Sequence, residues 1–274
     1  MPSARPVRTG VLQRGDVDLA YETTGVGPPL LVLASGYDDL PSSAALAALL
    51  RDDFTVLRYD RRGVGASHEE KAADAASRFR MHADDAAALV DAHGQGPVHV
   101  VGASYGALIG LELVARYPDR VLSALLHEPT LEYLVPDPER SAKLDGVARL
   151  AATDPLAAMG AFGEVVGSDD AREPDAPLPP QPHITERTIE QFFATDFSAV
   201  REYRVDDDAL IRSADRIVLT NGSHSAGRFE ARCSEALATR LGMEHRTLPT
   251  GHSALRTFPR TISEVLRGRL LGQG

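Results

Sequence analysis

The sequence predicts an α/β fold built on a mostly parallel sheet of eight strands. Short apolar runs such as Leu30-Leu31-Val32-Leu33-Ala34 are typical of strands buried on both faces of a parallel sheet, and they alternate with segments of helical periodicity. Glycine loops or polar residues follow several of these runs. Ligand sites of open parallel sheets form at such carboxyl ends, so we expect the functional site there.

The eight strands are expected in two groups. Residues 7–12 and 17–24 are predicted to form a hairpin-like pair at the antiparallel edge of the sheet. The remaining strands are expected at residues 30–34, 54–59, 98–101, 121–127, 216–220 and 244–248. Helical patterns are expected at residues 42–50, 79–93, 105–117, 228–241 and 254–271.

Strand–helix alternation stops between residues 129 and 208, which predicts a helical cap inserted into a core made of residues 1–128 and 209–274. Three cap helices are expected, at residues 138–152, 155–166 and 185–200. The second has Asp154 as its N-cap, Pro155 at its first position and Gly167 after its end. The proline-rich residues 168–182 are predicted to form a loop.

Composition restricts the function classes. The net charge of −10 disfavours nucleic acid and anionic membranes as partners, since both require a basic face, and a small-molecule substrate is expected instead. No apolar run approaches the length of a membrane span or of a signal peptide, so a cytoplasmic location is expected. Cys233 is the only cysteine, and no zinc-ligand spacing is present, so no metal or cofactor is expected. A homodimer is left open.

A Gly-x-Ser-x-Gly turn joins the strand at 98–101 to the following helix. Gly102 and Gly106 remove the side chains that would collide at a tight strand-to-helix turn, so the hydroxyl of Ser104 is exposed. An exposed serine at the carboxyl end of a parallel strand is a candidate nucleophile. It requires a base, and imidazole has a suitable pKa.

The chain resembles the α/β-hydrolase superfamily over nearly its whole length. The resemblance rests on the glycine loop at Gly36, the segment Asp60–Ser67, the turn around Ser104 and Gly251-His252 after the last strand. It implies Ser104 as nucleophile and His252 as base. It also implies that the backbone amides of Tyr37 and Tyr105 form an oxyanion hole. Asp60 and Arg61 match a motif that is chiefly structural in this family.

The acid is where this sequence departs from the family's commonest pattern. The family usually carries an Asp after the penultimate strand, but residues 221–227 contain no carboxylate. Glu128 ends the strand after the nucleophile helix, and His127-Glu128-Pro129-Thr130 is similar to the motif of zearalenone-type lactone hydrolases, which place their acid there. Glu128 is therefore the expected acid. The alternative is that it caps a cap helix or pairs with an arginine.

The expected activity is hydrolysis of a carboxylic ester or lactone of a hydrophobic molecule through an acyl-enzyme. Gly36 and the apolar cap residues Met159, Phe162, Phe192 and Phe193 are candidates for the substrate pocket, although packing of the cap helices against each other is the expected main use of the cap side chains. Two alternatives stay open. One is carbon–carbon bond hydrolysis or perhydrolysis on the same triad, and the other is a ligand receptor with a weak triad.

Overall fold

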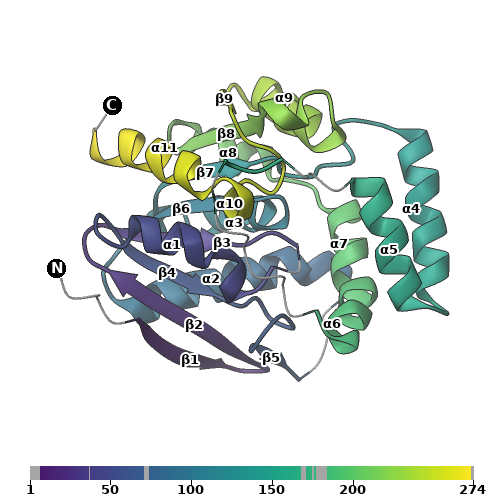
Figure 1. The fold of residues 1–274 in the computed structure, drawn as a ribbon, viewed down its shortest axis with the longest axis horizontal. Helices are drawn as coiled ribbons and strands as arrows, with labels where there is room; N and C mark the ends of the chain where they lie inside the picture. The colour runs from purple at the N-terminus through teal and green to yellow at the C-terminus, as the bar shows by residue number, and fades with distance from the viewer. Residues whose placement is uncertain are drawn as a thin grey trace.

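The computed structural model describes residues 7–36, 38–70, 74–167, 171–174, 176 and 184–272. Its centre is a nine-stranded sheet in the order β1-β2-β4-β3-β6-β7-β8-β9, with β5 paired to β2 (Figure 1). The pairs β1–β2, β2–β4 and β2–β5 are antiparallel, and the pairs from β4 to β9 along this order are parallel. The predicted α/β class and mostly parallel sheet are confirmed.

All eight predicted strands are present. The strands are β1 (Arg8–Arg14), β2 (Val17–Gly25), β3 (Pro29–Leu33), β4 (Thr55–Tyr59), β5 (His68–Glu69), β6 (Val98–Ala103), β7 (Val121–His127), β8 (Ile217–Gly222) and β9 (Glu244–Leu248). The ninth strand, β5, has two residues, which is too short to produce an alternating pattern in the sequence.

Helices cover both faces of the sheet. The helices are α1 (Ala44–Leu50), α2 (Arg78–His93), α3 (Tyr105–Arg116), α4 (Pro138–Ala151), α5 (Pro155–Val166), α6 (Glu186–Gln191), α7 (Phe197–Glu202), α8 (Asp207–Ile211), α9 (Phe229–Leu241), α10 (Ala254–Thr257) and α11 (Pro259–Leu271). One apolar cluster joins the sheet to α2, α3 and α9, and a second joins it to α1, α10 and α11.

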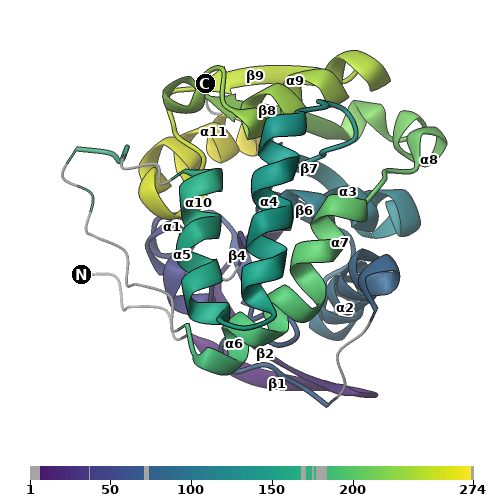
Figure 2. The same cartoon turned by 90° about the vertical axis from the view of Figure 1, so that its right-hand side faces the viewer.

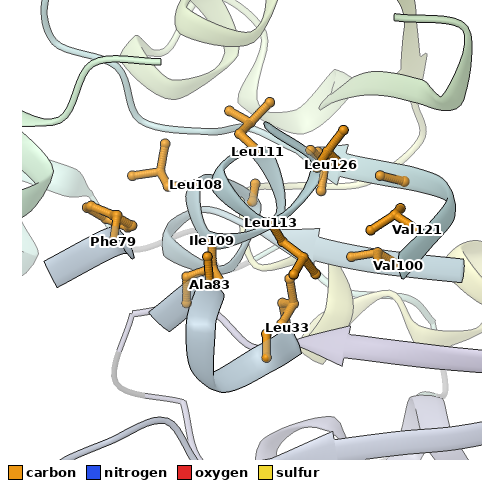
Figure 3. Packing of buried hydrophobic residues seen from close by; sticks show 14 of the residues in the cluster. Leu33, Phe79, Ala83, Val100, Leu108, Ile109, Leu111, Leu113, Val121 and Leu126 are labelled. Atoms are coloured by element: carbon orange, nitrogen blue, oxygen red, sulfur yellow. The ribbon is translucent and has the colours of Figure 1, made fainter. Parts of the chain in front are cut away.

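Successive strand residues enter opposite clusters, so the central strands are buried on both faces. In β3, Leu31 and Leu33 belong to the first cluster, whereas Leu30 and Val32 belong to the second. Figure 3 shows α3 at the centre of the first cluster, with its leucines packed between the strands and α2. Burial of this kind stabilises the fold by about 25 cal/mol per Å² of apolar surface, and it fixes the strand ends that carry the candidate site.

Two helices differ from the sequence expectation. The helix expected over 254–271 is divided into α10 and α11, because Pro259 cannot continue a helix and Phe258 before it leaves helical geometry (φ −129°, ψ 50°). The helix expected over 185–200 contains a π-helical turn, η4 (Phe192–Asp196), between α6 and α7. Most of the predicted loop at 168–182 lies outside the described residues.

Four of the helices between β7 and β8, α4 to α7, form a layer at one side of the sheet, whereas α8 packs against α3 and α9. Figures 1 and 2 show α4, α5, α6 and α7 there, with α4 and α5 side by side. Their shared interior is an apolar cluster of Leu144, Val147, Ala158, Phe192 and Phe197. As predicted, Asp154 caps α5 by accepting a hydrogen bond from the amide of Ala157, 2.9 Å away.

A buried ion-pair network ties this helical layer to the sheet. Asp196, in η4, accepts hydrogen bonds from Arg61 Nη1 at 3.0 Å and from Arg78 Nε at 2.6 Å. Each of these side chains is at most 4% exposed. Arg61 follows β4, and its guanidinium lies 4.2 Å from the centroid of the Tyr105 ring. Arg61 therefore has a structural role, through its contacts with Asp196 and the Tyr105 ring.

Candidate active site

Ser104 lies on a strained turn between β6 and α3. Its backbone has φ 52° and ψ −117°, which is unfavourable for a residue with a side chain. Gly106 permits this turn to sit against β3, because a Cβ atom there would lie 2.1 Å from the carbonyl oxygen of Leu33. A Cβ atom on Gly102 would in turn lie 2.6 Å from the carbonyl oxygen of Gly106. The two glycines are thus required for the turn that presents Ser104.

Glu128 is the only other non-glycine residue with positive φ in the described part of the chain, at 48°. It follows β7, and its amide donates to the carbonyl of Thr220 in β8 at 2.9 Å. The amide of Ser104 donates to the carbonyl of His127, 2.8 Å away. Strained backbone is retained where the surroundings hold it, and here it occurs at two adjacent strand ends.

His252 and Glu128 are in direct contact. The Nδ1–H group of His252 donates to Oε2 of Glu128 across 2.7 Å. Oε1 of Glu128 accepts hydrogen bonds from the amide of Gly222, at 2.8 Å, and from the hydroxyl of Ser225. Residues 221–227, at the end of β8 and just after it, contain no carboxylate and supply two hydrogen-bond donors to Glu128.

The environment favours ionised Glu128. Complete burial alone would raise the pKa of Glu128, but the hydrogen bond from His252, the nearby histidines and the Gly222 amide lower it to about 2. Burial also lowers the pKa of His252, but the hydrogen bond to Glu128 and the charges of Glu230 and Glu128 raise it above its ordinary value. A carboxylate that holds a basic imidazole in one tautomer is the arrangement required for general base catalysis.

His127 holds the loop before His252 in place. Its Nε2–H donates to the carbonyl oxygen of Gly251, 2.9 Å away, and its Nδ1 is 3.0 Å from the hydroxyl of Thr220. The ring is fully buried. Because Gly251 immediately precedes His252, these bonds fix the position of the imidazole relative to β7.

Ser104 and His252 line one cavity of about 890 Å³. Its walls combine the strand ends with the helical layer, and they include Ser35, Gly36, Asp38, Ser104, Tyr105, Leu108, Leu144, Phe162, Phe192, Phe197, Val200, Glu230, His252 and Arg256. The lining therefore combines apolar side chains with polar and charged ones, and the polar residues include the nucleophile and base candidates.

The pocket candidates fall into two groups. Gly36, Phe162 and Phe192 line the cavity. Met159 and Phe193 do not line it, which corrects the expectation for these two residues: both pack against the apolar cluster inside the helical layer. The ring centroids of Phe193 and Phe197 are 5.4 Å apart, so Phe193 has the packing role that is the expected main use of these cap side chains.

The two oxyanion candidates have different positions. Tyr37 lies outside the described residues. Tyr105 follows Ser104 and its residue lines the cavity, but its side chain is buried in the core. Its hydroxyl lies 3.0 Å from Nε2 of His82, which is fully buried. Burial lowers the pKa of His82 to about 3, so this ring is neutral.

Glu230 is a cavity residue that sequence reasoning missed, because its position inside a predicted helix placed it away from His252. It is buried in the first turn of α9, lines the cavity and accepts a hydrogen bond from Arg140 at 3.2 Å. Its charge contributes to the raised pKa of His252. Gly222 and Ser225, which donate hydrogen bonds to Glu128, lie shortly before α9, so the first turn of α9 is close to the same site.

The described ranges lack two kinds of feature, a cluster of metal-binding side chains and a membrane-spanning helix. No group of three or more His, Cys, Asp or Glu side chains there has an arrangement that could hold a metal ion. No helix in the same ranges is long and apolar enough to span a bilayer.

Comparison with known proteins places these features in context. The family model described as the α/β-hydrolase fold matches residues 28–160. The uncharacterized hydrolase YraK of Bacillus subtilis is 28% identical over 96% of both chains. The crystal structure of an α/β hydrolase from Sphaerobacter thermophilus is 24% identical, covers 94% of this chain and 98% of its own, and superimposes with a TM-score of 0.70. The last likeness concerns the fold alone.

Proposed function

We propose that this chain is a hydrolase of the α/β-hydrolase superfamily that cleaves a carboxylic ester or lactone of a hydrophobic small molecule, with Ser104, His252 and Glu128 as its triad. The observation that carries the proposal is the 2.7 Å hydrogen bond between His252 and Glu128 beside a cavity that Ser104 also lines. The strained turn at Ser104 also supports the proposal, because strained backbone is common at catalytic residues and Ser104 lines the cavity.

The reaction proceeds in two halves. The Oγ atom of Ser104 attacks the substrate carbonyl carbon while Nε2 of His252 accepts the hydroxyl proton, and ionised Glu128 stabilises the imidazolium that forms. The backbone amide of Tyr105 stabilises the oxyanion, which contributes about 3 kcal/mol. His252 then protonates the departing alcohol, leaving an acyl-serine. Water, deprotonated by His252, attacks the acyl carbon and releases the acid.

The cavity favours a substrate with an apolar part. Leu108, Leu144, Phe162, Phe192 and Phe197 contribute apolar side chains to its wall. An acyl or alcohol group placed against them gains about 25 cal/mol for each Å² of apolar surface removed from water. Lactones require no departing alcohol, so the same site serves open-chain and cyclic esters.

The test uses p-nitrophenyl butyrate and a fluorophosphonate probe. Ser104→Ala is expected to abolish turnover and covalent labelling, because no other group in the proposal forms the acyl-enzyme. Ser77→Ala, which removes a serine hydroxyl at the start of α2, is the matched control and should keep both. Full turnover in the Ser104→Ala variant would overturn the proposal. A ligand-induced melting shift with no turnover in the wild-type protein would favour a receptor instead.

A further inference from the structure

Arg256 lies on the same cavity wall as the proposed base. It belongs to α10, one helical turn after His252, and it lines the cavity together with Ser104. Its side chain is 24% exposed, so most of its surface is away from solvent. A residue of fixed positive charge is therefore placed beside the reacting groups without an evident role in the proposed triad.

The guanidinium of Arg256 has unused hydrogen-bond donors. Its one ion pair within the described structure joins Nη1 to Oδ1 of Asp38 at 3.6 Å, which is too long for a hydrogen bond. Its Nε is buried and has no hydrogen-bond partner in the described part of the chain. A guanidinium offers five N–H groups, and leaving them unpaired away from water is unfavourable.

The other two arginines of the cavity wall are already paired. Arg140 donates to Glu132 at 2.9 Å and to Glu230 at 3.2 Å. Arg201 donates to Asp145 at 2.7 Å. The Nε atoms of both arginines are also buried without a hydrogen-bond partner in the described residues, but their Nη groups are held by carboxylates of the protein itself, which is not the case for Arg256. This contrast marks Arg256 as the cavity arginine whose donors a ligand can reach.

Asp38 is a weak counter-ion for Arg256. Burial, together with the neighbouring Asp39, raises the pKa of Asp38 to about 6 despite the opposing effect of Arg256 and of a hydrogen bond to Ser42. An ionised carboxylate at this position is thus costly. Asp38 and Asp39 repel any anion beside Arg256, and they repel a phosphate dianion more strongly than a ligand with a single negative charge.

We propose that Arg256 binds a carboxylate carried by the substrate, so that the enzyme prefers half-esters of dicarboxylic acids to neutral esters. The planar guanidinium matches the two oxygens of a carboxylate, and this pairing is stronger than a neutral hydrogen bond. The carboxylate and the scissile carbonyl then occupy one cavity, the first at Arg256 and the second at Ser104. This inference rests on the proposed ester hydrolysis and specifies its substrate class.

The test compares p-nitrophenyl hydrogen glutarate with p-nitrophenyl butyrate. Wild-type kcat/KM is expected to be at least about 10-fold higher for the glutarate ester, which is the lower end of the effect of one charge-assisted hydrogen bond. Arg256→Met should raise KM for the glutarate ester, so that the ratio of kcat/KM between the glutarate and butyrate esters falls to about 1. Arg256→Lys keeps the charge without the planar fork and should retain part of the preference. Arg246→Met, an exposed arginine outside the cavity, is the control.

A second variant, Asp38→Asn, should increase the preference for the glutarate ester. Asp38→Asn removes a competing negative charge, so it should lower KM for the glutarate ester and raise the ratio of kcat/KM between the glutarate and butyrate esters above that of the wild type. Butyrate hydrolysis with no glutarate preference, or an equal preference in wild type and Arg256→Met, would overturn the role of Arg256 and leave the ester hydrolase standing.

If neither ester is hydrolysed, the proposed ester hydrolysis is wrong. The role of Arg256 in binding a carboxylate is then tested by a binding measurement that needs no turnover. Calorimetric titration with monomethyl glutarate should then give at least about 10-fold weaker binding to Arg256→Met than to wild type. Equal affinity for the two proteins would contradict the inference.

Discussion

Replacing Asp196 by alanine is expected to destabilise the protein strongly. Asp196 is 3% exposed, and it accepts hydrogen bonds from the buried side chains of Arg61 and Arg78. Burial alone would raise the pKa of Asp196, but the two arginines hold it well below its usual range, so it is ionised. Arg78 also donates to Glu69 at 2.7 Å, whereas Asp196 is the only acidic partner of Arg61 within the described residues.

The expected cost is about 4 kcal/mol. Two charge-assisted hydrogen bonds contribute about 1.5 to 3 kcal/mol each. Removal of one partner from a buried ion pair typically costs about 3 to 5 kcal/mol, because the remaining charge stays buried without compensation. For a chain of this size, 4 kcal/mol corresponds to a decrease in Tm of roughly 8 to 16 °C.

Urea unfolding followed by circular dichroism, together with a thermal melt, measures this cost. Asp145→Ala is the control, because Asp145 also pairs with an arginine at 2.7 Å but is 54% exposed, and exposed pairs contribute at most about 1 kcal/mol. Because the pKa of Asp196 is lowered on folding, its contribution is complete above about pH 5 and declines as the pH falls through its unfolded pKa of about 3.9. Equal losses in the two variants at pH 7 would refute the reasoning.

Three further predictions concern the site. kcat/KM should rise with pH through an apparent pKa above about 6.5, because His252 must be neutral to accept a proton. Glu128→Gln removes the negative charge that raises the pKa of His252, so the rise should occur at lower pH in this variant. A rise at the same pH in both proteins would contradict the role of Glu128. Gly106→Ala should cost about 3 kcal/mol in urea unfolding, since its Cβ would overlap the carbonyl oxygen of Leu33; wild-type stability would show that the turn relaxes. Ser225→Ala removes a donor to Glu128 and should lower stability by about 2 kcal/mol in the same assay, whereas no loss would mean that this hydrogen bond is dispensable.

Features with a local physical cause could be predicted from the sequence. The apolar runs predicted the strands, and the glycines around Ser104 predicted its turn, because both depend on residues a few positions apart. The cap of α5 at Asp154 belongs to the same class. Glu128 could be named as the candidate acid because it ends a strand next to the one that carries Ser104.

Contacts between distant segments could not be predicted in this way. The hydrogen bond from Arg61 to Asp196 spans 135 positions, and the one from Ser225 to Glu128 spans 97. A sequence pattern shows that Phe193 is on an apolar helix face but not whether that face meets substrate or another helix. Arg256 has no sequence signal, since its unusual property is the lack of hydrogen bonds to the residues around it in the described structure.

The central claim is that Glu128 serves as the acid of the triad, and one comparison of kcat/KM tests it most directly. Glu128→Ala and Asp215→Ala are measured with p-nitrophenyl butyrate, after circular dichroism has shown that both variants are folded. Asp215 lies in the short turn before β8, at the opposite end of that strand from the Glu128 contact at Gly222. Loss of the acid is expected to lower kcat/KM at least about 100-fold, toward the roughly 10⁴-fold effect known for such triads, while Asp215→Ala stays within about 2-fold of wild type. A larger loss in Asp215→Ala than in Glu128→Ala would contradict the account.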